Sequence, residues 1–246
     1  MRPRMERGTT KRALVIGAGG LGCAVLPLLA RAGCEIRLLD DDTVSLSNLQ
    51  RQLLYGTADL GRPKAEAAAA RVRSLVPGAS IEARLERLTA DTALDLLRDV
   101  DVVVDGSDNF PTRFLVNDAC VLAGIPLVHG AILRFTGQVM SIAPGDTACY
   151  RCLFEEAPPA GVVPSCAEAG VLGALCGIVG AWMAWSANTI LSGGKAGDGL
   201  IVHDALAGTT RVVGLGRDPA CAVCGDAASI RSLDPMMYEE ARACPA

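Results

Sequence analysis

The stretch that decides the fold runs Ala13-Leu14-Val15-Ile16-Gly17-Ala18-Gly19-Gly20-Leu21-Gly22. It joins a short apolar run to a glycine turn, and an uncharged segment typical of a helix continues to about Ala30. Gly17 permits the tight turn, Gly19 lets backbone N–H groups approach a phosphate, and Gly22 lets the helix pack closely on the strand. The order of strand, glycine turn and helix predicts a nucleotide site in which the helix N-terminus faces an anion.

Asp40 stands where nucleotide-binding folds place the acid that holds a ribose, about 20 residues beyond the glycine turn. It closes the largely apolar run Ile36-Arg37-Leu38-Leu39, which is expected to be the second strand. A glycine turn and an acid fit NAD as well as ATP. The nucleotide therefore has to be identified from other residues.

Beyond this first unit the chain alternates segments typical of strands and helices. Strands are expected at 81–85, 101–106 and 126–131, and helices at 64–75, 90–98 and 111–123. The continuous apolar run at 101–106 is typical of a parallel strand covered on both faces. Later in the chain we expect a strand at 136–142, a mobile Pro-rich loop at 155–165 and a hairpin at 200–213. These patterns predict an α/β fold of the Rossmann-like, doubly wound type, whose mainly parallel sheet continues into a C-terminal mixed or antiparallel part.

Composition and charge exclude several classes of function. A net charge of −4 and a pI of about 5.3 argue against a nucleic-acid surface. Ten cysteines without an export signal are typical of reduced thiols in the cytoplasm. Residues 171–194 carry no charge and are long enough to span a bilayer, but Trp182 and Trp185 lie in the middle of this segment. We therefore expect a buried or interface helix and no membrane span.

The cysteines form two Cys-x-x-Cys pairs, Cys149 with Cys152 and Cys221 with Cys224. Each pair can offer two thiolates to one tetrahedral Zn²⁺, so together they predict a four-cysteine zinc knuckle that ties the C-terminal part to the body. Cys166 follows the Pro-rich loop and is either a nucleophile or a packed cysteine. The cysteines in apolar stretches are expected to be small core residues: Cys23, Cys34, Cys120 and Cys176.

Arg51, Lys64 and Asp108 separate two kinds of nucleotide chemistry. A nicotinamide enzyme has no need of a cationic clamp beside a metal-binding carboxylate, whereas nucleotidyl transfer needs both. Lys64 is expected to open a helix and Asp108 to follow a strand, so both are expected to reach one crevice. Each of these residues taken alone is more simply a solvated side chain. His129, on an apolar strand, is expected to be a core residue.

Together these motifs resemble the ThiF/MoeB/HesA family, the bacterial relatives of ubiquitin-activating enzymes. The resemblance covers about residues 12–225 and includes Cys166-x-x-Ala169-Gly170 as well as the glycine turn and the cysteine pairs. Its most specific parts are Asp40-x-Asp42-Thr43-Val44-Ser45-Leu46-Ser47-Asn48-Leu49-Gln50-Arg51-Gln52, Gly61-Arg62-Pro63-Lys64 and Asp105-Gly106-Ser107-Asp108-Asn109. It implies ATP-dependent adenylation of the C-terminal glycine of a small ubiquitin-like sulfur-carrier protein, giving an acyl-adenylate and pyrophosphate.

The resemblance also implies roles for residues by their positions. Asp40 would hold the ribose, Lys64 a phosphate and Asp108 the Mg²⁺ ion. The implied ATP-binding set is Gly17, Gly19, Gly20, Gly22, Asp40, Asp42, Ser47, Asn48, Leu49, Gln50, Arg51, Lys64, Asp108 and Asn109. The implied catalytic residues are Arg51, Lys64, Asp108 and Cys166, the last of which matches the thiol that links to the carrier in the ThiF branch. The four cysteines of the two pairs match the family's zinc ligands.

The resemblance further implies one domain over residues 1–246. Its parts are a nucleotide-binding half at 12–135, a carrier-binding and zinc half at 136–225 and a peripheral tail at 226–246. We expect a homodimer, a carrier ending in Gly-Gly and a separate sulfur donor, because the sequence contains no rhodanese-like domain. It also lacks the Arg-Tyr-x-Arg-Gln motif of the family's N-terminal arm, so we expect that another cation takes its place, that the start of the chain is truncated or that the activity is weakened. A non-catalytic partner subunit and an NAD-dependent oxidoreductase are the alternatives.

Overall fold

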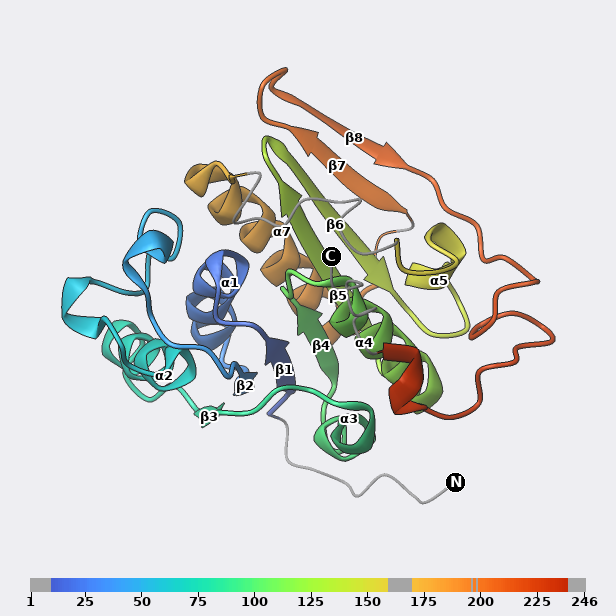
Figure 1. Cartoon of the computed structure of the whole chain (residues 1–246), viewed down its shortest axis with the longest axis horizontal. Helices are drawn as coiled ribbons and strands as arrows, with labels where there is room; N and C mark the ends of the chain where they lie inside the picture. Colours follow the sequence, from blue (N-terminus) through green and yellow to red (C-terminus); the bar gives the residue numbers. More distant parts are fainter. Residues whose placement is uncertain (1–9, 159–169, 196, 198, 239–246) are drawn as a thin grey trace, which may run out of the picture.

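One eight-stranded sheet runs through the chain, with helices on both of its faces (Figure 1). The structure is a computed structural model and describes residues 10–158, 170–195, 197 and 199–238. Its strands are β1 (Arg12–Ile16), β2 (Glu35–Leu39), β3 (Ile81–Arg84), β4 (Val102–Asp105), β5 (Leu127–Leu133), β6 (Thr136–Ile142), β7 (Leu200–Asp204) and β8 (Thr209–Val213). Its helices are α1 (Gly20–Arg31), α2 (Lys64–Leu75), α3 (Ala90–Leu96), α4 (Phe110–Ala123), α5 (Tyr150–Leu153) and α7 (Gly173–Leu191). Short 3₁₀ turns are η1 (Leu46–Asn48), η2 (Thr57–Asp59) and η3 (Pro235–Tyr238).

The order of the strands confirms the predicted fold. They follow one another in the order β3-β2-β1-β4-β5-β6-β7-β8, with the first five parallel and the last three added antiparallel. The strand order therefore reverses between β1 and β4, which is the point where doubly wound sheets bind their ligands. The predicted hairpin forms as β7 and β8, joined by a turn in which Gly208 has a φ of +64°.

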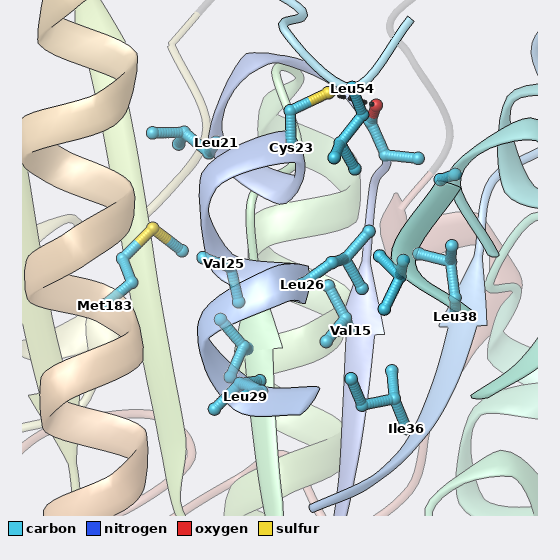
Figure 2. Close-up of a cluster of buried hydrophobic side chains, with 14 of the residues drawn as sticks. Val15, Leu21, Cys23, Val25, Leu26, Leu29, Ile36, Leu38, Leu54 and Met183 are labelled. Carbon is cyan, nitrogen blue, oxygen red and sulfur yellow. Dashed lines mark hydrogen bonds between the residues drawn. The ribbon is translucent and has the colours of Figure 1, made fainter. Parts of the chain in front are cut away.

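Buried side chains form one core on each face of the sheet. Alternate residues of β1 point to opposite faces, so Val15 faces α1, α2 and α7 while Leu14 faces α3 and α4. Figure 2 shows Leu26 of α1 beside Val15 of β1, with Met183 of α7 on the other side of the helix. These two cores fix the glycine turn and the end of β4 relative to each other.

Helix α7 is the uncharged segment for which the sequence predicts either a buried helix or an interface helix. It is the only helix of the described residues long and apolar enough to cross a membrane, and 44% of its most apolar window is buried inside the fold. Its inner face rests on β5 and β6, where Gly130 leaves room that Met183 fills, and a Cβ at Gly130 would overlap the Met183 sulfur. Its outer face is exposed, with Trp185 at 61%. The helix is therefore half core and half uncovered apolar surface.

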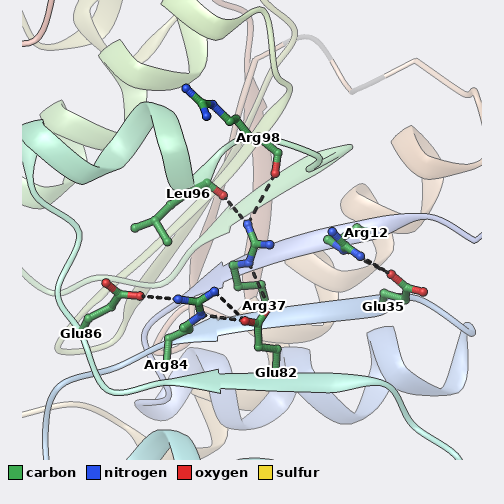
Figure 3. Close-up of polar contacts among 8 residues, drawn as sticks. All are labelled: Arg12, Glu35, Arg37, Glu82, Arg84, Glu86, Leu96 and Arg98. Atoms are coloured by element: carbon green, nitrogen blue, oxygen red, sulfur yellow. Dashed lines mark hydrogen bonds and ion pairs between the residues drawn. The ribbon is translucent and has the colours of Figure 1, made fainter. Parts of the chain in front are cut away.

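Ion pairs hold the outer strands of the parallel half (Figure 3). Arg37 of β2 pairs with Glu82 of β3 at 3.2 Å and donates to the Leu96 carbonyl at the end of α3 at 2.8 Å. Arg12 of β1 pairs with Glu35 of β2 at 2.8 Å. These contacts link β1, β2 and β3, and the pair of Arg12 and Glu35 lies at the start of its two strands, opposite their carboxyl ends.

The segment after residue 226 was expected at the periphery, but it contributes to the core on the face of the sheet that carries α3 and α4. Ile230 is 8% exposed, and the Tyr238 hydroxyl donates to Asp118 of α4 at 2.8 Å. Asp118 is buried and also binds the Arg151 guanidinium, so Tyr238 completes a polar cluster that holds the end of the described chain against α4. The Pro-rich loop lies mostly outside the described residues.

Candidate functional site

A cleft opens at the carboxyl ends of β1 and β4, where the strand order reverses. The sequence-predicted residues that line it are Gly17, Gly19, Gly20, Asp40, Asp42, Arg51, Lys64, Asp108 and Asn109. The predicted residues outside the lining are Gly22, Ser47, Asn48, Leu49 and Gln50. The fold thus gathers residues that are up to about 90 positions apart in sequence around one space.

The glycine turn has the geometry that its spacing predicts. Gly17 has a φ of +91°, which a residue with a side chain rarely adopts. A Cβ on Gly22 would overlap the Gly17 carbonyl oxygen, so Gly22 is required for the close packing of α1 on the turn. Helix α1 starts at Gly20, and its positive N-terminus points into the cleft. The turn therefore suits an anionic ligand such as a phosphate.

Asp40 anchors the turn from the end of β2. Its Oδ2 accepts a hydrogen bond from the Ala18 N–H at 2.7 Å, and its Oδ1 accepts one from the Asp42 N–H at 2.9 Å. Burial raises the pKa of the Asp40 carboxyl, although these two N–H donors and the Lys64 charge oppose the rise. Each carboxylate oxygen keeps a lone pair toward the cleft, which fits the ribose role that the sequence implies.

Lys64 brings a cation to the same space, as the first residue of α2. Its side chain is only 8% exposed, and its Nζ pairs with Asp42 Oδ2 at 2.7 Å. The Asp42 side chain is 63% exposed, so the pair lies at the border between the interior and the cleft. A buried ammonium is costly without an anionic partner, so an incoming phosphate is well placed to share or replace Asp42.

Arg51 comes from the segment after η1 and is the one member of the 47–51 motif that lines the cleft. Its guanidinium donates to the Ser47 carbonyl at a long 3.4 Å, so the charge is only lightly held. Gln52, next in the chain, is 3% exposed, and its Oε1 has no hydrogen-bond partner among the described residues. The motif therefore places a lightly held cation and an unsatisfied polar atom beside the glycine turn.

Asp108 lies exposed at the cleft in the turn that follows β4. The turn ends at Asn109, whose Oδ1 accepts from the Thr112 N–H at 2.9 Å and so caps α4. The Ser107 Oγ is buried without a partner among the described residues. The exposed carboxylate of Asp108 is an oxygen ligand of the kind that Mg²⁺ prefers, so this residue fits that ion.

Several cleft residues were not found from the sequence. The Tyr55 hydroxyl donates to the Ala18 carbonyl at 2.8 Å and holds the glycine turn from behind. Burial raises the Tyr55 pKa, so the phenol stays a donor. Arg87, Leu88 and Arg113 line the cleft from the segment after β3 and from α4. Their positions after a strand and on the first turn of a helix are the only sequence signal that indicates them, and it is shared by many residues.

The two Cys-x-x-Cys pairs meet on the face of the sheet that carries α4. The Sγ atoms of Cys149, Cys152, Cys221 and Cys224 all lie within 4.8 Å of one another. Cys149 and Cys221 are 3.6 Å apart at sulfur, and Cys152 and Cys224 are 3.4 Å apart. Four thiolates bound to one tetrahedral Zn²⁺ have similar separations, because each Zn–S bond is about 2.3 Å long. The cluster fits a closed structural zinc site.

The remaining cysteines divide into core residues and residues outside the described part. Burial raises the pKa of Cys23 to about 12 and that of Cys34 to about 11, as expected for packed thiols. Cys120 is buried, as expected, while Cys176 is buried at the cleft wall beside Gly20. The predicted carrier thiol, Cys166, lies outside the described residues.

Comparison with known proteins gives consistent matches over nearly the whole chain. A family model described as the ThiF family matches residues 2–223. A "Sulfur carrier protein adenylyltransferase" from Thermus thermophilus is 49% identical over 93% of this chain and 87% of its own length. A "SAMP-activating enzyme E1" from Haloferax volcanii is 47% identical over 94% of this chain and 86% of its own. The crystal structure of E. coli MccB with AMPCPP and SeMet MccA has the same fold, with a TM-score of 0.77 at 22% identity over 89% of this chain and 67% of that one.

Proposed function

The chain belongs to the ThiF family, and on that premise we propose that it is an adenylyltransferase that activates the C-terminal carboxylate of a small ubiquitin-like sulfur carrier. The observation that carries the proposal is the cleft itself. It combines the glycine turn with two cations, Arg51 and Lys64, and with the exposed carboxylate of Asp108. The names of the two relatives above, which cover most of this chain, support the same activity.

In the proposed reaction an oxygen of the carrier's terminal glycine carboxylate attacks the α-phosphorus of ATP. The bond from that phosphorus to the bridging oxygen of pyrophosphate breaks, so an acyl-adenylate and pyrophosphate form. The N-terminus of α1 and the Lys64 ammonium offset the negative charge of the phosphates, and Arg51 reaches the same side of the cleft. Asp40 orients the nucleotide through its ribose. Mg²⁺, held by Asp108, would neutralise phosphate charge and favour the departure of pyrophosphate.

The cysteine cluster has a structural role in this proposal. We assign it Zn²⁺, because four thiolates at tetrahedral separations satisfy that ion without leaving an open position for substrate. The cluster lies on the α4 face of the sheet, away from the residues that line the cleft.

The uncovered face of α7 supports the predicted homodimer. Its exposed residues follow helical spacing and are all apolar: Ala174, Gly177, Ile178, Ala181 and Trp185. Ile178 is 41% exposed and Trp185 is 61% exposed, and Leu28 of the neighbouring α1 is 36% exposed. A stripe of this kind on one helix face is typical of a protein interface. We propose that a second copy of the chain covers it, and that sulfur comes from a separate donor.

The proposal is tested by exchange of labelled pyrophosphate into ATP, with Mg²⁺ and a carrier that ends in Gly-Gly. We expect exchange that depends on the carrier and disappears when its last glycine is removed. Exchange absent with every Gly-Gly carrier encoded near this chain's gene would overturn the proposal. Calorimetry then separates the alternatives, because a non-catalytic platform would bind no Mg²⁺–ATP, and an oxidoreductase would bind NAD in its place.

A further inference from the structure

The turn that carries Asp108 is held from below by its neighbour Ser107. The Ser107 N–H donates to Asp105 Oδ1 at 2.9 Å. Its carbonyl accepts from the Arg113 Nε at 3.3 Å and Nη2 at 3.2 Å. The backbone N–H and C=O of Ser107 are therefore both held, and Asn109 on the other side of Asp108 is fixed by its capping bond to α4. The Asp108 side chain itself is exposed, so its direction depends on this frame.

The frame rests on a buried pair between Asp105 and His129. Asp105 is the last residue of β4 and lies opposite His129 within β5, and His129 Nδ1 is 2.8 Å from Asp105 Oδ2. Their side chains are 1% and 6% exposed. The His129 ring packs edge-on against the Tyr150 ring at 5.0 Å, so the imidazole has little freedom to turn away from the carboxylate. One Asp105 oxygen thus holds His129 while the other holds the Ser107 peptide.

The chemistry of the pair suits a positioning role better than a packing role. A carboxylate in a dry core costs folding free energy, and an apolar pair of similar size would fill the same space without that cost. Burial raises the pKa of Asp105, but the hydrogen bonds from His129 and from the Ser107 N–H outweigh it and lower the pKa overall. The carboxyl therefore stays ionised and keeps both oxygens as acceptors, which is what a fixed Ser107 peptide needs.

We propose that Asp105 and His129 are positioning residues that aim the Asp108 carboxylate at the metal of the Mg²⁺–nucleotide. The inference rests on the proposed function for the identity of that metal. It adds that metal binding depends on a side chain that does not line the cleft. His129 donates to Asp105, Asp105 accepts from the Ser107 N–H, and this bond fixes the backbone from which Asp108 projects. Partners that orient a metal ligand in this way typically change metal affinity 10- to 100-fold when they are removed.

The test compares His129→Leu, which removes the donor, with His129→Asn, whose amide nitrogen can replace Nδ1. The matched control is Val128→Ala, because Val128 is the preceding residue of β5, is fully buried and belongs to the core on the opposite face. The measured quantity is the affinity for Mn²⁺ in the presence of ATP, which is monitored through the EPR signal of free Mn²⁺. Thermal unfolding is recorded for each variant.

We expect about a 10-fold weaker Mn²⁺ affinity for His129→Leu, a change within about 2-fold for His129→Asn, and no change for Val128→Ala despite its lower unfolding temperature. Equal Mn²⁺ affinities for His129→Leu and Val128→Ala would overturn the inference. If His129→Leu does not fold, Arg113→Lys decides, because it keeps the charge but loses the forked contact with the Ser107 carbonyl. Unchanged Mn²⁺ affinity in Arg113→Lys would then count as refutation.

This design separates the two proposals. Wild-type protein that binds Mn²⁺ with ATP but shows no carrier-dependent exchange would overturn the proposed function and leave the positioning role in place. Normal carrier-dependent exchange in the wild type, together with unaltered Mn²⁺ binding in the His129 and Arg113 variants, would overturn the positioning role and leave the proposed function in place.

Discussion

Loss of the metal from the cysteine cluster is expected to destabilise this chain by a specific and measurable amount. The perturbation is Cys152→Ser, which leaves three thiolates. In the folded chain a metal bound to the cluster would join Cys149 and Cys152, at the short helix α5, to Cys221 and Cys224 in the C-terminal segment. Helix α5 is also held by the core through Tyr150, which is 3% exposed. The sheet is therefore expected to stay folded when the cluster opens, while the C-terminal segment keeps only its core contacts and the Tyr238 hydrogen bond.

The expected loss in free energy of unfolding follows from the length of the loop that the metal would close. About 70 residues separate Cys152 from Cys221, and a cross-link over a loop of that length constrains the unfolded chain by about 4 kcal/mol. Zinc sites in small peptides reach about 10–16 kcal/mol, but there the metal supplies nearly the whole fold. For a domain of this size about 4 kcal/mol corresponds to a drop in unfolding temperature of about 10 °C. The value of about 4 kcal/mol applies here because the two hydrophobic cores of the sheet stay folded without the metal.

The assay combines elemental analysis with thermal unfolding. Wild-type protein is expected to carry one zinc ion per chain and to lose about 10 °C of stability when a strong chelator removes it. Cys152→Ser is expected to lose the zinc without chelator. Cys34→Ala is the control, because Cys34 is buried and outside the cluster, and it should keep the metal. Wild-type protein free of metal, with an unfolding temperature insensitive to chelator, would refute the reasoning.

Three further predictions concern the cleft, the interface and pH. Asp108→Ala and Arg51→Ala are each expected to lower carrier-dependent pyrophosphate exchange about 100-fold or more, because each removes a charge that stabilises the transition state; full exchange in both would contradict the assigned site. Trp185→Glu should convert a dimer to a monomer in analytical ultracentrifugation, while a dimer of unchanged affinity would locate the interface elsewhere. The free energy of unfolding should fall as the pH drops below about 6.5. Asp105 and His129 both have lower pKa values in the folded chain than in the unfolded chain. At low pH the unfolded chain therefore binds more protons than the folded chain, and this favours unfolding. The groups that face the imidazole are the Asp105 carboxylate, the Tyr150 ring and the Arg113 charge, and denaturant titrations of wild type and His129→Asn would measure its share.

Local sequence was sufficient to predict the elements whose residues lie close together in the chain. The glycine turn is an example, because Gly17 and Gly22 are five residues apart and their roles depend only on backbone geometry. The parallel strands were predictable for a similar reason, since continuous apolar runs such as 101–106 are typical of strands covered on both faces. The strand order confirms this part of the prediction.

Contacts between distant residues were not predictable in the same way. His129 was expected to be a core residue, and its burial confirms this, but nothing in its neighbourhood indicates that it binds Asp105 on the next strand. That contact depends on the register between β4 and β5, which the sequence of either strand alone leaves open. Tyr55 is similar, because its hydroxyl contacts the Ala18 carbonyl, 37 residues earlier in the chain, only when the chain is folded.

The cysteine cluster and the cleft are connected by a few side chains that contact one another in the core on the α4 face of the sheet. Tyr150 lies between Cys149 and Cys152 in sequence and packs its ring on His129, while the Tyr150 N–H donates to the buried Asn117 side chain at 2.8 Å. A metal bound to the cysteine pair would therefore add to the core contacts that already hold the ring confining His129. A core can transmit a shift over this distance because it is packed too tightly to absorb it. If this is the route, removal of zinc should weaken Mn²⁺ binding in the presence of ATP in wild type but add little in His129→Leu, where the contact with Asp105 is already lost. Additive effects of the two changes would show that the cysteine cluster and the cleft act independently.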